Sequence, residues 1–480
     1  MAEGLTGAGD YQLEILDLIT VAGLRVDLKA SCFGLIIYED LFSLTLTGTI
    51  AISDSVNLAS FGPIIGQEYL YLKIKTPSLP DTEVSSIDFS ENVFLIHTVS
   101  SRRQIADGVQ GYVFSFVSQE LVKNQRLKVT QSLTASWSDI VEKMLRDSHY
   151  LNTKKNVTIE RTAGVKRFVA PNIRPLDLVV LGTKQAYSTF QGEPNFLFYE
   201  NFEGFNFRSV ASLYNNGPTF NFRTVPAGTN TVGAGRNYDI VKEMETILEY
   251  EIISNNDTIV GYRSGMYGSK LITHDIVNKS YDTHIYNYLD QFSKEKHIVG
   301  GVTSGFEEHP FISDLYVSKE GRLSDFHGRT YVMPVTNKSG VEGTDGAHTT
   351  SASTQPFSSS NPKHWLQRRN SQMLQLENAF NINLKVHGNT MVRIGDVVTV
   401  KIPYITASSL KKEQQFDKFY NGPFIVKRIR HDFSMVDTPR KHTMHMSLVK
   451  DSLEERLPSR DDNMEPSAAS HGSSRIYSFN

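Results

Sequence analysis

The chain has 480 residues, of which 39% are hydrophobic and 21% are charged, and its 49 basic and 52 acidic side chains give a net charge of −3. This length allows two to four domains with sizeable cores, and the balanced charge excludes a general nucleic-acid binder with a basic arm. The single cysteine, Cys32, lies in an apolar run. It excludes an intramolecular disulfide and a cysteine zinc site, and it predicts a buried thiol.

The N-terminus, Met1 to Asp10, lacks the charged start and apolar core of a signal peptide. No apolar run approaches the roughly 18 residues that are needed to span a bilayer. We therefore expect a protein that is made in a reducing cytoplasm and has no membrane partner.

The first predicted unit covers residues 10–127, after a flexible N-terminus at 1–9. Its half-buried strand pattern rests on apolar residues of one parity, Leu44, Leu46, Ile50 and Ile52. Gly48 interrupts that apolar face, and we expect a bulge or bend there. Alternation returns at 70–75 and 112–117 with no helical pattern between, which predicts a β-barrel or a strongly curved sandwich.

The second predicted unit, residues 128–237, is an inserted α/β module. Its segment from Ser136 to Asp139 resembles a capping box and precedes apolar residues at helical spacing, Ile140, Val141, Met144 and Leu145. Pro175 holds a favoured first-turn position of a second helix, which extends to Ala186. The segment 226–235 has the composition of an exit linker.

The stretch from Phe196 to Ser209 contains five phenylalanines and a tyrosine. Two short aromatic runs around a turn predict a β-hairpin in which Gly204 takes a positive φ. So many aromatic side chains form either an internal core or an assembly surface. We expect Phe205 and Phe207 to pack internally or against a neighbouring subunit, with the hairpin as the scaffold of the module.

A second β unit is predicted at 238–299 and 363–452, interrupted by a long excursion at 300–362 that is poor in periodicity. The polar tail at 453–480 has no apolar period, and we expect it to be flexible or ordered by a partner. The fold class is therefore α+β and mainly β, with two tube-like β-barrel domains and an inserted helix-plus-hairpin module.

Within the second β unit, a helix over 363–377 is predicted to have an apolar face that includes Trp365, Leu366, Met373 and Leu376. The clearest strand of the chain follows, because alternate residues are apolar, namely Phe380, Ile382, Leu384 and Val386. Further strands are predicted at 248–252, 398–402, 424–429 and 444–449.

Sequence motifs of catalysis are absent: there is no Gly-x-Ser-x-Gly elbow, no phosphate-binding loop and no His-Glu-x-x-His. The Gly-Ala-Gly at 233–235 lacks a following Lys-Ser or Lys-Thr. His442 and His445 are the nearest approach to a metal-ligand pair, but strand alternation places them on opposite faces. His431 and Asp432 are expected to form a satisfied polar pair.

Two groups of carboxylates are the acid–base candidates of the chain. Glu307, Glu308 and His309 form a solvated acidic loop in the excursion, and Glu200 and Glu203 flank a tight turn without a sugar cleft. We therefore expect no catalytic, cofactor-binding or metal-binding residue, no cofactor and no enzymatic activity.

Several strand and turn motifs occur together in a specific order. The first unit contains Ile37-Tyr-Glu-Asp-Leu-Phe42, Leu46-Thr-Gly-Thr-Ile50, Asp54-Ser-Val-Asn-Leu58 and Pro63-Ile-Ile-Gly-Gln-Glu68. The middle module contains Arg174-Pro-Leu-Asp177 and the aromatic hairpin, and the last unit contains Val386-His-Gly-Asn-Thr390, Gly395-Asp-Val397, Tyr420-Asn-Gly-Pro-Phe-Ile-Val426 and Val449-Lys-Asp-Ser452. In this order and spacing, over residues 10–455, the chain resembles baseplate or tail hub proteins of long-tailed bacteriophages, especially those with contractile tails.

The resemblance implies a homotrimer in which each chain contributes two tube-like barrels, so that three chains form a pseudo-sixfold ring. Such a hub joins the sixfold tail tube to the threefold central spike, contacts other baseplate proteins, and forms the distal end of a channel that DNA crosses without specific binding. It resides in the virion, at the tail tip. The excursion and the segment after 451 match no family motif, so their contacts are open.

Three other functions stay open from the sequence. The chain is alternatively a tail-associated cell-wall hydrolase, although it has no separable catalytic domain. It is alternatively a glycan- or receptor-binding tail protein, although fibre repeats and β-helix periodicity are absent. A related hypothesis is that the chain is the hub-like part of a secretion-system spike.

Overall fold

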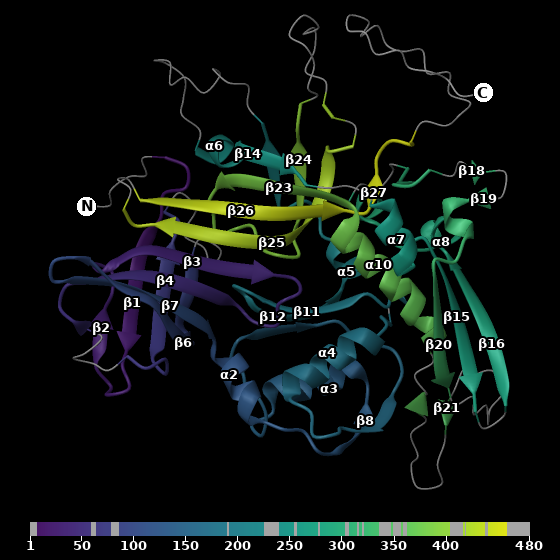
Figure 1. Cartoon of the computed structure of the whole chain (residues 1–480), viewed down its shortest axis with the longest axis horizontal. Coiled ribbons are helices and arrows are strands. Elements are labelled where there is room, and N and C mark those ends of the chain that lie inside the picture. The colour runs from purple at the N-terminus through teal and green to yellow at the C-terminus, as the bar shows by residue number, and fades with distance from the viewer. Residues whose placement is uncertain are drawn as a thin grey trace, which may run out of the picture.

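The computed structural model is α+β and mainly β (Figure 1). It describes residues 7–58, 64–77, 86–189, 192–224, 240–253, 257–276, 279–302, 307–313, 316–318, 321–335, 347–348, 357–358, 362–403, 416–417, 419–436 and 440–457. The predicted linker at 226–235 and most of the polar tail lie outside these residues. The predicted fold class is confirmed at this level.

Thirteen of the described strands form one sheet. Its first group comprises β1 (Gln12–Ile19), β2 (Arg25–Asp27), β3 (Cys32–Asp40), β4 (Thr47–Asp54), β5 (Tyr69–Lys75), β6 (Ser86–Ala106) and β7 (Val109–Ser118). Its second group comprises β13 (Phe220–Arg223), β14 (Ile247–Ile252), β23 (Phe380–His387), β24 (Val397–Lys401), β25 (Gly422–Ser434) and β26 (Lys441–Lys450). These strands confirm the alternation predicted for both β units.

The two groups are hydrogen-bonded to each other, because β25 pairs with strands of both. One edge of β25 pairs with β26, and the other edge is shared: Gly422 to Ile425 pair with β24, and Arg428 to Ser434 pair with β3. The main path runs β14-β23-β26-β25-β3-β4-β7-β6-β5-β1-β2 and does not close among the described strands. These pairings therefore do not form two separately closed barrels. The edge of β25 that would have to close the second strand group on itself is shared with β3 of the first group.

The sheet position of Gly48 corrects one expectation. Gly48 lies opposite Ile37 and Phe116 in regular antiparallel register, with no bulge. A Cβ at this position would lie 2.2 Å from Cζ of Phe116 and 2.5 Å from the carbonyl oxygen of Ile36. Glycine is present because the Phe116 ring occupies the space of a side chain, which no strand pattern reveals.

The inserted module follows the first strand group and has a core of its own around Trp137. Its elements are α2 (Gln119–Arg126), β8 (Ser132–Ala135), α3 (Trp137–Arg146), β9 (Asn156–Ile159), β10 (Lys166–Val169), α4 (Pro175–Gln185), β11 (Phe196–Asn201), β12 (Gly204–Ser209) and α5 (Val210–Tyr214). The predicted cap is confirmed, because Ser136 Oγ accepts a hydrogen bond from the backbone N–H of Asp139 at 3.2 Å. Pro175 begins α4 as predicted.

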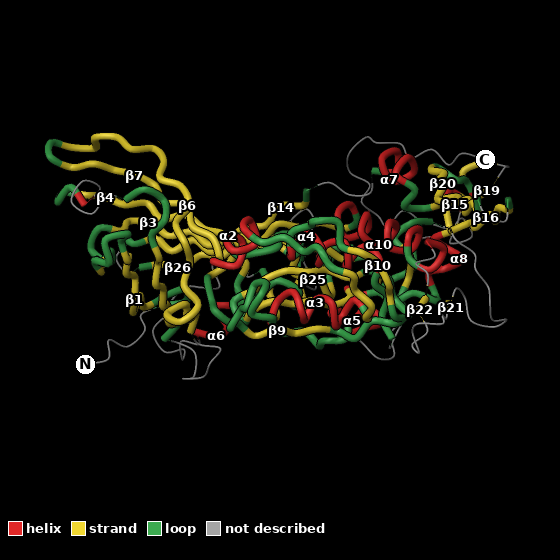
Figure 2. Tube along the Cα trace, turned by 90° about the horizontal axis from the view of Figure 1, so that it is seen from below, coloured by secondary structure: helices red, strands yellow, loops and turns green. Residues whose placement is uncertain are grey.

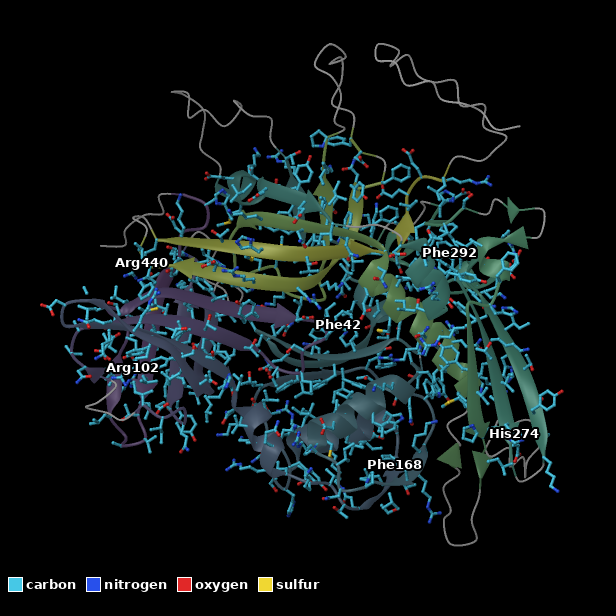
Figure 3. The ribbon with its side chains drawn as sticks, viewed as in Figure 1. Phe42, Arg102, Phe168, His274, Phe292 and Arg440 are labelled. Atoms are coloured by element: carbon cyan, nitrogen blue, oxygen red, sulfur yellow. The ribbon has the colours of Figure 1, made fainter. Side chains whose placement is uncertain are left out.

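A smaller sheet, ordered β16-β15-β20, projects from the opposite end of the molecule to the first strand group (Figure 1). Its strands are β15 (Gly268–Asp275), β16 (Ser280–Asn287) and β20 (Arg329–Val335), and His274 marks its outer part in Figure 3. The excursion therefore contains regular structure, since β20 pairs in parallel with β15. No residue of β20 is fully buried, so the strand lacks the apolar alternation that would have predicted it.

The remaining short elements include α6 (Ile240–Met244), which lies beside β14 in Figure 1. The others are α7 (Thr258–Ser264), α8 (Tyr288–Phe292), α9 (Ile298–Val302), β17 (His309–Pro310), β18 (Tyr316–Ser318), β19 (Gly321–Arg322), η2 (Leu323–Asp325), β21 (Ala347–His348), β22 (Phe357–Ser358), η3 (Pro362–His364) and β27 (Ser452–Leu453). β27 pairs with β17, so the first residues of the predicted tail contact the excursion.

The helix predicted over 363–377 is α10 (Leu366–Asn378), and its buried face agrees with the prediction in part, since Leu376 is buried in the core and Met373 packs against it. Gln367 donates a hydrogen bond to the carbonyl of Ser269 at 3.0 Å, and Ser371 donates one to that of Met266 at 2.6 Å. Gln372 and Gln375 are also buried on this side. The helix packs through these hydrogen bonds as well as through Leu376, so a search for apolar residues alone identifies only part of its buried face.

Figure 2, turned from the view of Figure 1, shows strands gathered at one end and helices toward the other, with the β6–β7 hairpin extending from the strand end. Within the described residues, no helix is long and apolar enough to cross a membrane. Cys32 is free and buried, as expected.

Candidate functional site

The aromatic hairpin is formed by β11 and β12, and both of its faces are buried. On one face, Phe198 stacks on Phe205 with ring centroids 5.6 Å apart and an angle of 4° between the planes. Phe196 and Phe207 lie beside them with centroids 4.9 Å apart. All four rings belong to the core of the inserted module. The prediction of an internal core is confirmed for Phe205 and Phe207.

The other face of the hairpin packs into a different core. Leu197 and Tyr199 are buried among the residues of the second strand group. The hairpin therefore lies between the core of the inserted module and the core of the large sheet. Its turn depends on Gly204, which has a φ of +142° and pairs in parallel with Asn156 of β9.

A buried ionic group lies at the turn end of this hairpin. Lys155 Nζ donates to Glu120 Oε2 at 2.8 Å and to Glu200 Oε1 at 2.6 Å, and all three side chains are almost fully buried. The second oxygen of Glu200 accepts the backbone N–H of Leu46 at 2.9 Å, next to the start of β4. The group thus connects α2, the hairpin and the first strand group.

The pKa values of Lys155 and Glu200 in this ionic group are shifted because the side chains are buried. Burial disfavours the ammonium of Lys155, but the carboxylates of Glu200 and Glu120 outweigh it and raise the pKa of Lys155. Burial also raises the pKa of Glu200. Two carboxylates share one ammonium, so Glu200 takes up a proton more readily than an exposed carboxyl while Lys155 stays charged.

A second buried polar chain lies where β3, β25 and β26 meet. His431 Nε2 is 3.2 Å from Glu39 Oε1, and His431 Nδ1 is 3.1 Å from Nε2 of His442. Burial holds the pKa of His442 well below its ordinary value, so its ring is neutral. The expected pairing of His431 with Asp432 is wrong, since Asp432 faces Arg430 instead. The placement of His442 inside and His445 outside is confirmed.

The outward face of the large sheet is polar where the two strand groups meet. A groove of about 420 Å³ crosses β14, β23, β26, β25 and β3 on this face. Its charged residues form pairs of opposite sign: Arg428 Nε donates to Asp40 at 2.7 Å, and Lys385 lies 3.6 Å from Glu249. The lysine and arginine side chains that line this groove therefore face carboxylates.

The carboxylates considered for catalysis do not form a catalytic pair. Glu200 is buried in the ionic group, whereas Glu203 is largely exposed and pairs with Arg393. Glu308 accepts the backbone N–H of Gly300 at 2.9 Å, so it is a local structural contact. Among the described residues, no group of three His, Cys, Asp or Glu side chains is placed to hold a metal ion.

Sequence reasoning missed the residues that join these elements. Lys155 and Glu200 are 45 residues apart, and Glu39 and His431 are 392 apart. No short-range pattern connects such positions. The one available signal was the occurrence of charged residues such as Glu39 and Glu200 at apolar-face positions of predicted strands.

No protein-family model matches the chain, and no curated protein matches it in sequence. Three solved structures illustrate what its fold is similar to. A tail protein from Neisseria meningitidis MC58 has 10% identity and a TM-score of 0.49, covering 92% of this chain and 97% of that one. The 43 kDa tail protein of prophage MuSo2 from Shewanella oneidensis has 8% identity and a TM-score of 0.49, covering 91% and 98%.

The third is the E. coli c3393 protein, a type VI secretion component described as structurally similar to T4 bacteriophage tail proteins gp27 and gp5. It has 9% identity and a TM-score of 0.36, covering 94% of this chain and 79% of that one. These solved structures are thus two tail proteins, one of them from a prophage, and one type VI secretion component.

Proposed function

We propose that the chain is a structural tail hub, located at the tip of a phage tail, that joins a sixfold tail tube to a threefold central spike. The observation that carries this proposal is the pairing of β25 with β3, which fuses two strand groups into one sheet. Three such chains around an axis would present six strand groups, the number that a sixfold tube requires.

The fused sheet has the rigidity that a symmetry adapter needs. The seven paired positions between β3 and β25 fix the relative register of the two groups. The sheet path ends at β2 and β14 among the described strands. Unpaired edges of this kind are covered when chains meet in a ring, so the trimer accounts for both ends.

The polar face of the sheet suits the wall of a channel for DNA. Tight DNA binding requires lysine and arginine side chains that neutralise phosphates. Here Arg428 and Lys385 already face carboxylates, and the whole chain carries a net charge of −3. We propose that DNA passes along this face without specific binding.

The predicted domain boundaries become part of the proposal: two tube-like units at 10–127 and 238–299 plus 363–452, with an inserted module at 128–237. The excursion at 300–362 and the tail at 453–480 are assigned to contacts with the spike or other baseplate proteins. The assembly forms in the host cytoplasm and has no catalytic role.

Mass photometry of the purified chain, alone and with its tube and spike partners, tests the proposal. We expect trimers of three times 54.0 kDa, either alone or on addition of partners. Only monomers under all conditions would refute the hub function. A gel-shift assay with duplex DNA in low salt is expected to show no complex, and a zymogram on peptidoglycan is expected to show no clearing.

A further inference from the structure

A cleft of about 510 Å³ lies where the inserted module, α10 and the small sheet meet. Figure 1 shows α10 running between α4 and β20, and the cleft is lined from all three. Its walls include apolar side chains such as Leu181 and Met373. Both the volume and the position between modules are typical of ligand sites in proteins.

The cleft contains a cation without an acidic partner. Arg369 of α10 donates from Nε to the carbonyl of Thr183 at 3.0 Å and from Nη2 to that of Phe196 at 3.5 Å. Neither partner is charged, and burial lowers the pKa of Arg369 to about 10. Arginines elsewhere on the same helix differ, since Arg368 is paired with Glu193 and Glu295. Within the described residues, Arg369 is therefore a buried guanidinium with no carboxylate.

Two aromatic residues of the same cleft have unused polar atoms. The indole Nε1 of Trp365 and the hydroxyl of Tyr331 are buried and have no hydrogen-bond partner in the described structure. Lys184, at the end of α4, adds an exposed ammonium at the rim. The cleft thus combines donor groups and two cations with apolar and aromatic walls.

We propose that this cleft binds a carboxylate that is carried next to an apolar side chain on a partner polypeptide. The carboxylate contacts Arg369 and Lys184, and the apolar group packs among Leu181, Met373 and the aromatic rings. A guanidinium donates two parallel hydrogen bonds to the oxygens of a planar carboxylate, which is why arginine is the favoured partner in buried sites.

One acidic residue, Glu377, also lines the cleft. It follows Arg369 by eight residues on α10, which places their backbones about 12 Å apart along the helix. No carboxylate contributes to the pKa shift of Arg369, so Glu377 does not neutralise its charge. The carboxylate of the ligand therefore binds at the end of the cleft that contains Arg369 and Lys184. At the other end of the cleft, Glu377 repels a second negative charge.

The test uses the full-length protein and N-acetyl-phenylalanine as the probe, with N-acetyl-phenylalanine amide as the matched neutral compound. Trp365 is one of only two tryptophans, and the other, Trp137, is buried in the inserted module. Tryptophan fluorescence therefore reports binding, and Trp365→Phe assigns the signal. We expect saturable binding of the acid, at least tenfold weaker binding of the amide, and no competition by acetate.

Variants separate the site from the fold. Arg369→Gln is expected to weaken binding at least tenfold, and Lys184→Glu, an exposed change at the rim, several-fold. Lys143→Glu, an exposed change of the same charge on α3, is expected to leave binding unchanged. Equal affinity for acid and amide, full competition by acetate, or undiminished binding by a folded Lys184→Glu variant would overturn the proposal.

Discussion

Replacing Gly204 with valine is expected to destabilise the protein strongly, because this residue combines an unusual backbone with a close neighbour. Its φ is +142°, a conformation that residues with a Cβ rarely adopt. A Cβ built here would lie 2.2 Å from the carbonyl oxygen of Asn156 in β9. The obstacle is backbone and not a flexible side chain, so it cannot move aside without breaking the β9–β12 pairing.

The magnitude follows from the two causes. The unfavourable φ costs about 1–3 kcal/mol, and forcing a side chain into a packed site adds about 1–3 kcal/mol. We expect the sum to be about 2–6 kcal/mol, a large part of the roughly 5–15 kcal/mol by which typical domains are stable.

A matched control isolates the two causes. Gly108, in the turn between β6 and β7, has a φ of +75°, and no atom lies within 4 Å of the position that a Cβ would occupy. Gly108→Val therefore carries the backbone cost alone, about 1–2 kcal/mol. Urea unfolding followed by fluorescence of Trp137, in the same module as Gly204, measures the difference.

If Gly204→Val shifts the unfolding free energy by no more than Gly108→Val does, the contact with Asn156 has no energetic role. Unchanged solubility and assembly of Gly204→Val would likewise show that the hairpin is not the scaffold of its module.

Three further substitutions test other parts of the structure. Lys155→Met removes the cation between two buried carboxylates and is expected to cost about 3–5 kcal/mol at pH 7, measured by urea unfolding; a cost below about 1 kcal/mol would show that the group is not desolvated. Asp396 is buried, which raises its pKa from 3.8 to about 6, so its proton is retained on folding and stability falls as pH rises through this range. Asp396→Asn is therefore expected to gain up to about 3 kcal/mol over the wild type at pH 7 and little at pH 3.5, and equal gains at both would contradict the burial argument. Gly48→Ala is expected to cost about 1–3 kcal/mol because its Cβ would meet both the Phe116 ring and the carbonyl oxygen of Ile36, and an unchanged melting temperature would show that both adapt freely.

Elements with a strong local signal were predictable from the sequence. The cap at Ser136, the start of α4 at Pro175 and the alternation from Phe380 to Val386 each depend on neighbours within a few residues, and each is confirmed. The hairpin belongs with them, because a glycine between two aromatic runs is a local signal. The number of its rings allowed either an internal core or an assembly surface, and the structure shows the internal core.

Features that depend on distant partners were not predictable. The pairing of β3 with β25 joins residues about 390 positions apart, and neither strand has a marker for the other. The apolar pattern of α10 predicts the burial of Leu376 but not that of Gln367 and Ser371, because their hydrogen bonds to Ser269 and Met266 have no local signal. Arg369 has no sequence signal of burial, since its guanidinium is held by the carbonyls of Thr183 and Phe196, which are distant in the sequence.

The position of the hairpin between two cores has a consequence for how the inserted module is held. Phe196 and Phe198 belong to the core of that module, while Leu197 and Tyr199, from the same strand, belong to the core of the large sheet. Because alternate residues of one strand point to opposite faces, the two cores cannot separate without exposing one side of β11. Glu200 adds a second connection through the backbone of Leu46. The inserted module is therefore fixed to the sheet by the strand that also forms its own core, and a perturbation at Gly204 acts on both.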